Sequence, residues 1–141
     1  MVADVDSPDK HNVLAERLDE AEKLARKILV TQPENPDALN GLGLICVQQE
    51  RFDEAVELFA HAHEIDPERG DFTNNLLKAF ESSAKSMAHA ARYGAAIKTL
   101  ERALVMSPGD EYLTCRMSFA LSLANRHGEA LAAANNRPWL N

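Results

Sequence analysis

The chain has 141 residues, 45% hydrophobic and 26% charged, so it is long enough to bury a core and has the composition of a folded domain. Its net charge of −7 argues against a nucleic-acid binder, which needs clustered Lys and Arg to replace phosphate counterions. No run of about 18 apolar residues is present, which argues against a membrane partner, and the polar N-terminus lacks a signal-peptide core. We therefore expect a cytoplasmic protein.

Apolar residues recur at intervals of three and four along most of the chain, a spacing typical of helices. Asn35-Pro36, Asp71 and Asp110 are candidate helix starts, because their side chains can cap the first turn. Pro33, Pro67 and Pro108 each end the helix before them. In chain order, the pattern predicts eight helices in four antiparallel hairpins, over residues 8–17 and 19–31, 36–49 and 53–65, 71–91 and 94–106, and 110–124 and 128–136.

A short motif that begins with arginine and ends with alanine occurs four times, and its alanines are Ala21, Ala55, Ala96 and Ala130. They are 34, 41 and 34 residues apart. A proline stands twelve residues after each of the first three, at Pro33, Pro67 and Pro108. Two markers with the same spacing indicate an internal repeat.

These residues resemble the tetratricopeptide repeat family. The second repeat matches the family pattern at Leu42-Gly43, Ala55, Phe59, Ala62 and Pro67, and the third matches at Ala96, Leu100, Ala103 and Pro108. The resemblance implies an all-α fold, a right-handed α-solenoid of antiparallel helix hairpins whose small residues let paired helices approach closely. We expect one domain over residues 1–141 with three to four repeats, at about 2–35, 36–69, 70–110 and 111–141.

The third repeat is seven residues too long, so one of its helices should have two additional turns and about twenty residues in all. Counting from the front places Leu76-Leu77 at the family's Leu-Gly pair, and counting from the back places Phe80 and Ala84 at its Trp and Gly positions. The additional turns either form a contact for self-association or a partner, or lie against the chain itself. Candidate oligomer contacts are Ala84, Met87, Ala88, Trp139 and Leu140, of which the last two alternatively cap the final repeat.

No arrangement of a nucleophile with a base, no glycine-rich phosphate loop and no paired metal-ligand spacing is visible, so we expect no enzyme activity, cofactor or metal. His61 and His63 are two residues apart on a predicted helix, so their imidazoles point in different directions and cannot hold one ion. Cys46 and Cys115 fall on apolar stripes and are predicted to be buried free thiols.

In the family, ligands usually lie along the concave face that the first helix of each hairpin forms. By position, this implies a partner-binding surface that contains Asn40, Leu44, Val47, Gln48, Tyr112, Arg116 and Phe119, together with Asn74, Asn75 and Lys78 if the third repeat is counted from the front. Only Asn40, Asn75, Lys78 and Arg116 lie near the places of the family's carboxylate clamp. We therefore expect a scaffold or adaptor that holds a peptide or protein segment in an apolar groove with polar edges. The alternatives are an interaction or self-assembly domain of a larger protein, for instance a transferase, and a small secretion-type chaperone.

Overall fold

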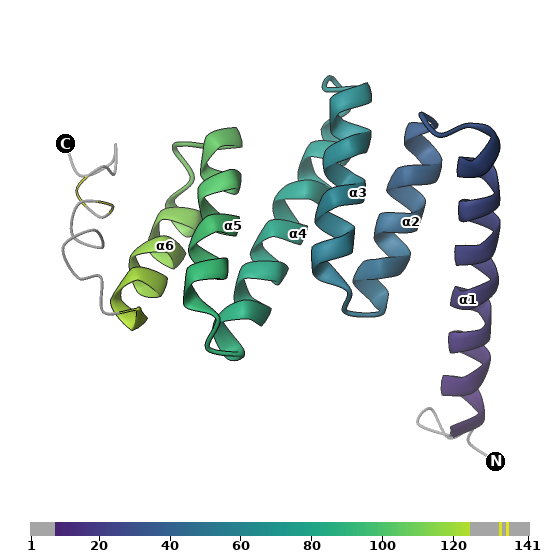
Figure 1. The fold of residues 1–141 in the computed structure, drawn as a ribbon, viewed down its shortest axis with the longest axis horizontal. Helices are drawn as coiled ribbons and strands as arrows, with labels where there is room; N and C mark the ends of the chain where they lie inside the picture. Colours follow the sequence, from purple (N-terminus) through teal and green to yellow (C-terminus); the bar gives the residue numbers. More distant parts are fainter. Residues whose placement is uncertain (1–7, 125–132, 134, 136–141) are drawn as a thin grey trace, which may run out of the picture. The chain divides into compact units, whose positions relative to one another are not determined.

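The computed structural model describes residues 8–124, 133 and 135 (Figure 1). The part described contains six helices and no strand, so the predicted all-α fold is confirmed. The helices are α1 (Pro8–Thr31), α2 (Pro36–Gln48), α3 (Phe52–Ile65), α4 (Gly70–His89), α5 (Tyr93–Met106) and α6 (Glu111–Leu123). The chain forms two compact units, Met1–Thr73 and Asn74–Asn141, and their boundary falls within α4.

In the first unit, α2 packs against both α1 and α3. Leu39, Ala62 and Phe72 form a buried cluster, and three partly buried side chains, Leu29, Leu58 and Ile65, pack against it. The small residues expected between α2 and α3 are in place, since Gly43 is buried and Ala55 and Ala62 are fully shielded from solvent. Burial of these apolar side chains is the main favourable contribution to the stability of the unit.

The turns after α2 and after α4 have the same backbone geometry. Glu50 and Ala91 have positive φ angles of 57° and 59°, and the amides of the arginines that follow donate to carbonyls five residues back. The Arg51 amide lies 2.8 Å from the Cys46 oxygen, and the Arg92 amide lies 2.8 Å from the Met87 oxygen. This is the Schellman arrangement, which satisfies carbonyls that the helix end leaves open.

The first predicted hairpin is wrong, because residues 8–17 and 19–31 form one continuous helix, α1, of 24 residues. The four residues that α2 buries, Leu39, Leu42, Gly43 and Cys46, correspond 34 residues earlier to Val5, Pro8, Asp9 and Asn12. Three of these four carry no core-forming side chain, so a hairpin would gain little burial there. Helix formers such as Ala15, Glu16 and Leu18 continue the helix instead.

The bounds of the five predicted helices between residues 36 and 124 agree with the structure to within two residues. The predicted helix 128–136 lies outside the described residues, apart from 133 and 135. The Asn35 and Asp110 side chains accept from the amides of Ala38 and Leu113, each at 3.0 Å, which confirms both caps. Asp71 is not a cap of this kind, since it lies in the first turn of α4 and pairs with Arg69 at 2.9 Å. The prolines act as expected, because α1, α3 and α5 each end two residues before one.

The long helix of the third repeat is also confirmed, because α4 has 20 residues whereas α5 has 14. Ala84 lies eight residues before Arg92, as Gly43 lies eight residues before Arg51, and the two turns are alike. Counting from the back therefore matches the geometry, and Ala84 corresponds to Gly43. The two additional turns stand at the beginning of α4.

The prediction for the two cysteines is half right. Cys46 is fully buried, and burial raises the pKa of its thiol, whereas Cys115 is exposed. On α6 the buried residues include Leu113, Thr114 and Met117, and a residue two positions after Leu113 points about 200° away from it. Cys115 therefore lies on the opposite side of the helix from the core.

Candidate ligand-binding surface

The predicted binding residues of the first unit lie on α2, away from its buried stripe. The Leu44 side chain is 45% exposed and Gln48 is exposed, while Asn40 and Val47 are half-buried. Leu44 and Gln48 are four residues apart and therefore share one side of the helix. The surface offers an apolar contact next to an amide that can both donate and accept hydrogen bonds.

In the second unit, α6 exposes two aromatic side chains on one face. Tyr112 is 51% exposed and Phe119 is 57% exposed, and half-buried Arg116 lies between them in the sequence. The three residues are spaced at i, i+4 and i+7, so they form a single stripe. The Arg116 guanidinium carbon lies 5.9 Å from the centre of the Tyr112 ring, within cation–π range.

The predicted residues of α4, Asn74, Asn75 and Lys78, follow from counting the third repeat from the front. Because counting from the back matches α4, these three do not hold the concave-face positions that the front count gave them, although Lys78 and Arg116 both lie near Glu81. Asn74 and Lys78 are exposed, and Asn75 and Glu81 are half-buried. Burial raises the pKa of the Glu81 carboxyl, the nearby Asp110 carboxylate raises it further, and Arg116 and Lys78 oppose both effects. Because Asp110 caps α6 and Arg116 lies on it, charged groups of α4 and α6 are close enough to interact electrostatically.

Leu44 and Phe119 occupy equivalent places. Each stands nine residues after a side chain that caps its helix, Asn35 for α2 and Asp110 for α6. Both are largely exposed although both are large and apolar. Each unit therefore displays an apolar side chain at the same position of a first helix, outside the core.

The candidate oligomer contacts differ in accessibility. Ala84 is only 3% exposed and is not accessible to a second copy in this structure, whereas Met87 and Ala88 are half-buried. The Thr99 hydroxyl donates to the Met87 sulfur at 3.4 Å, so the end of α4 packs against α5. Trp139 and Leu140 lie outside the described residues.

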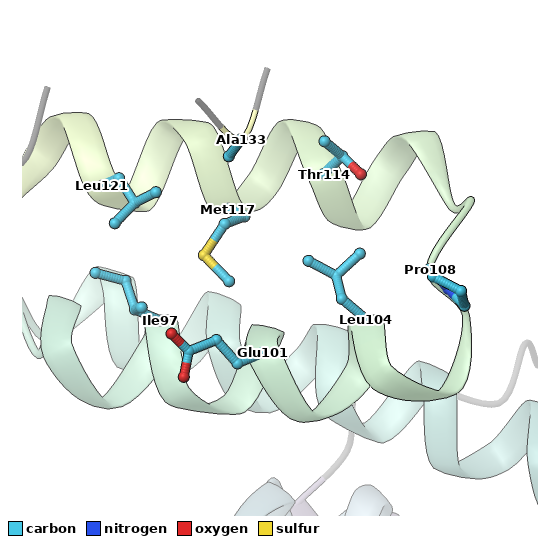
Figure 2. A pocket seen from close by; sticks show the side chains of 8 residues that line it. All are labelled: Ile97, Glu101, Leu104, Pro108, Thr114, Met117, Leu121 and Ala133. Atoms are coloured by element: carbon cyan, nitrogen blue, oxygen red, sulfur yellow. The ribbon is translucent and has the colours of Figure 1, made fainter. Parts of the chain in front are cut away.

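A hollow of about 360 Å³ lies between α5 and α6 (Figure 2). Met117 and Leu121 of α6 point towards Ile97 and Glu101 of α5, and Leu104, Pro108, Thr114 and Ala133 complete the lining. Thr114, Met117 and Leu121 correspond, 75 residues earlier, to Leu39, Leu42 and Cys46, which are core residues of the first unit. The α6 residues that line the hollow therefore hold core positions of the repeat, and the predicted second helix of that repeat, 128–136, lies outside the described residues apart from 133 and 135.

His61 and His63 contact neighbouring side chains. His61 Nε2 lies 3.3 Å from a Glu34 carboxylate oxygen, and Nδ1 of half-buried His63 lies 3.2 Å from the Thr73 hydroxyl. Among the residues that the structure describes, no three His, Cys, Asp or Glu side chains are grouped so that they could hold a metal ion. Within the same residues, no helix is both long and apolar enough to cross a membrane.

Sequence reasoning missed an ion-pair cluster that joins α1 to the α2–α3 hairpin. Arg26 pairs with Glu22 at 2.9 Å and with Glu54 at 2.8 Å, and Arg51 pairs with Glu22 at 3.1 Å and with Glu54. Hydrogen bonds from Arg26 and Arg51 lower the pKa of both carboxyl groups. The repeated arginine of the motif, Arg51, was the available signal, but the sequence did not indicate its partners.

The chain matches the family model of the tetratricopeptide repeat over residues 34–109, more than half of its length. It belongs to the tetratricopeptide repeat family. The matched range contains α2 to α5, and α1 and α6 lie outside it. Membership confirms the helical solenoid class for the fold and, in general terms, a scaffold for protein interactions.

Solved structures agree with this assignment. The MamA structure labelled AMB-1 is 25% identical to the chain with a TM-score of 0.56, and the match covers 88% of this chain and 64% of MamA. MamA from MSR-1 is 22% identical with a TM-score of 0.54, over 88% of this chain and 67% of that one.

A structure of Naa15/Naa10 bound to HypK-THB also matches, at 17% identity and a TM-score of 0.56, over 84% of this chain and 17% of the other. At these identities, the MSR-1 and Naa15/Naa10 matches show the fold alone. The match thus spans about two thirds of the MamA chains and 17% of the chain in the Naa15/Naa10 structure. No curated protein sequence matches it.

Proposed function

We propose that this tetratricopeptide repeat protein is a non-catalytic scaffold that binds a segment of another polypeptide along the first helices of its hairpins. The observation that carries the proposal is the exposed stripe of Tyr112, Arg116 and Phe119 on α6. A helix of this fold already buries its core stripe on another side, so two exposed aromatic rings on the remaining side favour a contact surface.

The chemistry of the surface favours an amphipathic segment with apolar side chains and a carboxylate. Phe119 and Tyr112 supply flat apolar area that loses little side-chain entropy on binding. Lys78 and half-buried Arg116 can pair with a carboxylate, and Arg116 can do so with two parallel hydrogen bonds. Glu81 and Asp110, on the same surface, would repel a segment that is acidic throughout, which favours one with a single anionic group.

A comparative pull-down tests this function. The bait is the full chain, and the variant is Phe119→Ala combined with Arg116→Ala. The matched control is Val105→Ala, because Val105 is 84% exposed on α5 and lies off the proposed surface. We expect one or more proteins to be captured by the wild type and by the control but lost from the double variant. Identical captured proteins for all three baits would contradict the proposal.

A further inference from the structure

The turn after α4 changes which residues of this helix correspond to the binding residues of α2. The turns after the two helices are alike, so their residues correspond at an offset of 41. This offset places Glu81 where α2 has Asn40, and Lys85 where α2 has Leu44. In the second unit, α4 therefore has two charged residues at positions of the proposed binding surface.

Glu81 is a half-buried carboxylate without an ion pair. Among the described residues it pairs with no cationic side chain, whereas Glu22, whose side chain is 17% exposed, pairs with both Arg26 and Arg51. Burial raises the pKa of Glu81, while hydrogen bonds from the two arginines lower the pKa of Glu22. A carboxylate that loses hydration without gaining a cation is destabilised in its charged form. The Glu81 carboxylate thus lacks a partner for its charge.

The charged groups near Glu81 on α6 do not supply this partner. Asp110 carries the same charge and raises the pKa of Glu81 further. Arg116 and Lys78 act in the opposite direction, but neither forms an ion pair with Glu81. The Arg116 guanidinium carbon instead lies 5.9 Å from the centre of the Tyr112 ring. Two carboxylates that interact electrostatically, on a chain with a net charge of −7, attract a cation.

Lys85, one turn after Glu81, is exposed and forms no ion pair with it. An exposed pair at this spacing is weak, because water and salt screen it. A cation that a bound segment delivers interacts more strongly, since the segment also excludes water from the carboxylate. The cation that suits Glu81 is therefore one that arrives with a ligand.

An exposed ring adds a second requirement on this cation. Phe119 is 57% exposed and follows Arg116 by three residues, so it lies about one helical turn from a group that interacts with Glu81. Lysine and arginine bury their methylene stems on apolar surfaces, and the faces of aromatic rings attract cations. A lysine or arginine side chain matches this combination of a carboxylate and a ring.

We propose that the segment bound by this surface carries a lysine or arginine side chain that pairs with Glu81, so that Glu81 determines which segments bind. The inference rests on the proposed function, because it names a feature of the segment that the α6 stripe holds. The carboxylate that pairs with Lys78 and Arg116 and the cation that pairs with Glu81 then belong to one segment of low net charge.

Selection from a phage-displayed library of random peptides tests the inference. The baits are the full chain as wild type, as Glu81→Gln and as Glu64→Gln, the matched control, because Glu64 is exposed on α3 and lies off the proposed surface. Wild type and control should enrich peptides that carry lysine or arginine beside apolar residues. Glu81→Gln should keep the apolar residues and lose the cation. Equal enrichment of the cation by Glu81→Gln and wild type, or no enrichment by wild type above the library frequency, would overturn the inference.

A double-mutant cycle on one enriched peptide measures the pair directly. Glu81→Gln should weaken binding of this peptide about tenfold. Methionine in place of the peptide's cation should weaken binding to the wild type by a similar factor and leave binding to Glu81→Gln unchanged. Losses that add in full would overturn the pairing.

Phe119→Ala separates the failure of this inference from the failure of the proposed function. Peptides that bind the wild type and Phe119→Ala equally well would overturn the proposed function, and the inference with it. Peptides that require Phe119 but bind wild type and Glu81→Gln with equal affinity would overturn the role of Glu81 alone.

Discussion

Gly43 shows how one residue controls the contact between α2 and α3. A Cβ at this position would lie 2.5 Å from Cε1 of Phe59 and 2.8 Å from Cδ1, and the Phe59 ring is only 1% exposed. Gly41, two residues away on the same helix, has open space at the equivalent point.

Gly43→Ala should therefore destabilise the fold by about 1–3 kcal/mol, because the buried ring has to move. Gly41→Ala should be neutral or stabilise by up to about 1 kcal/mol, because alanine favours the helix. Urea unfolding of the two variants measures the difference. Equal stabilities would show that the α2–α3 contact is not as close as described.

The positive φ angles at Glu50 and Ala91 give a second prediction at this scale. A residue with a Cβ in the left-handed region costs about 1–2 kcal/mol of folding free energy. Replacing it by glycine removes this strain, but part of the gain is lost because glycine gives the unfolded chain more conformational entropy. Ala91→Gly should therefore stabilise the chain by about 0.5–1 kcal/mol in urea unfolding. Lys98→Gly, at an exposed site inside α5, is the control and should destabilise by about 1 kcal/mol. A loss of stability in Ala91→Gly would argue against the Schellman turn.

At the scale of the elements, the bounds of α2, α3, α5 and α6 could be predicted because local chemistry sets them. Asn35 and Asp110 begin helices with their side chains, and prolines follow where α1, α3 and α5 end. The continuity of α1 could not be predicted from the repeat. The motif at Arg17 marks where a turn is expected, but the residues before it lack the apolar side chains that a separate first helix would bury. The exposure of Cys115 was missed because helix periodicity does not say which of two apolar sides faces the core.

The ion pairs between α1 and the α2–α3 hairpin predict a pH dependence of stability. Hydrogen bonds from Arg26 and Arg51 hold the pKa of Glu22 below its ordinary value of 4.5. The pKa of Glu54 is also lowered, chiefly by its hydrogen bond from Arg26. A carboxyl whose pKa is lower in the folded state stabilises that state above the unfolded pKa, and this contribution is lost as pH falls through the folded pKa.

The melting temperature should therefore fall as the pH is lowered from about 5 towards 3. Glu22→Gln should show a shallower fall over this range, because one of the two titrating groups is gone. High salt should reduce the difference between the two proteins, since the pairs are partly exposed. Parallel pH profiles for wild type and variant at low salt would argue against the cluster.

At the scale of the whole molecule, each unit displays a large apolar side chain at the same position of a first helix, Leu44 on α2 and Phe119 on α6. The side of α6 that carries Tyr112 and Phe119 is proposed to bind a polypeptide segment. The family pattern already pointed to this surface, but only the structure gives the exposure of its side chains.

Site-specific photo-cross-linking tests the central claim, that the first helices hold another polypeptide. A benzophenone amino acid placed at residue 119 in the full chain should yield, in the native cells, an adduct with a protein other than this chain. The same group at residue 105 should yield none. Adducts of equal yield from both positions, or adducts from residue 119 with this chain alone, would contradict the claim.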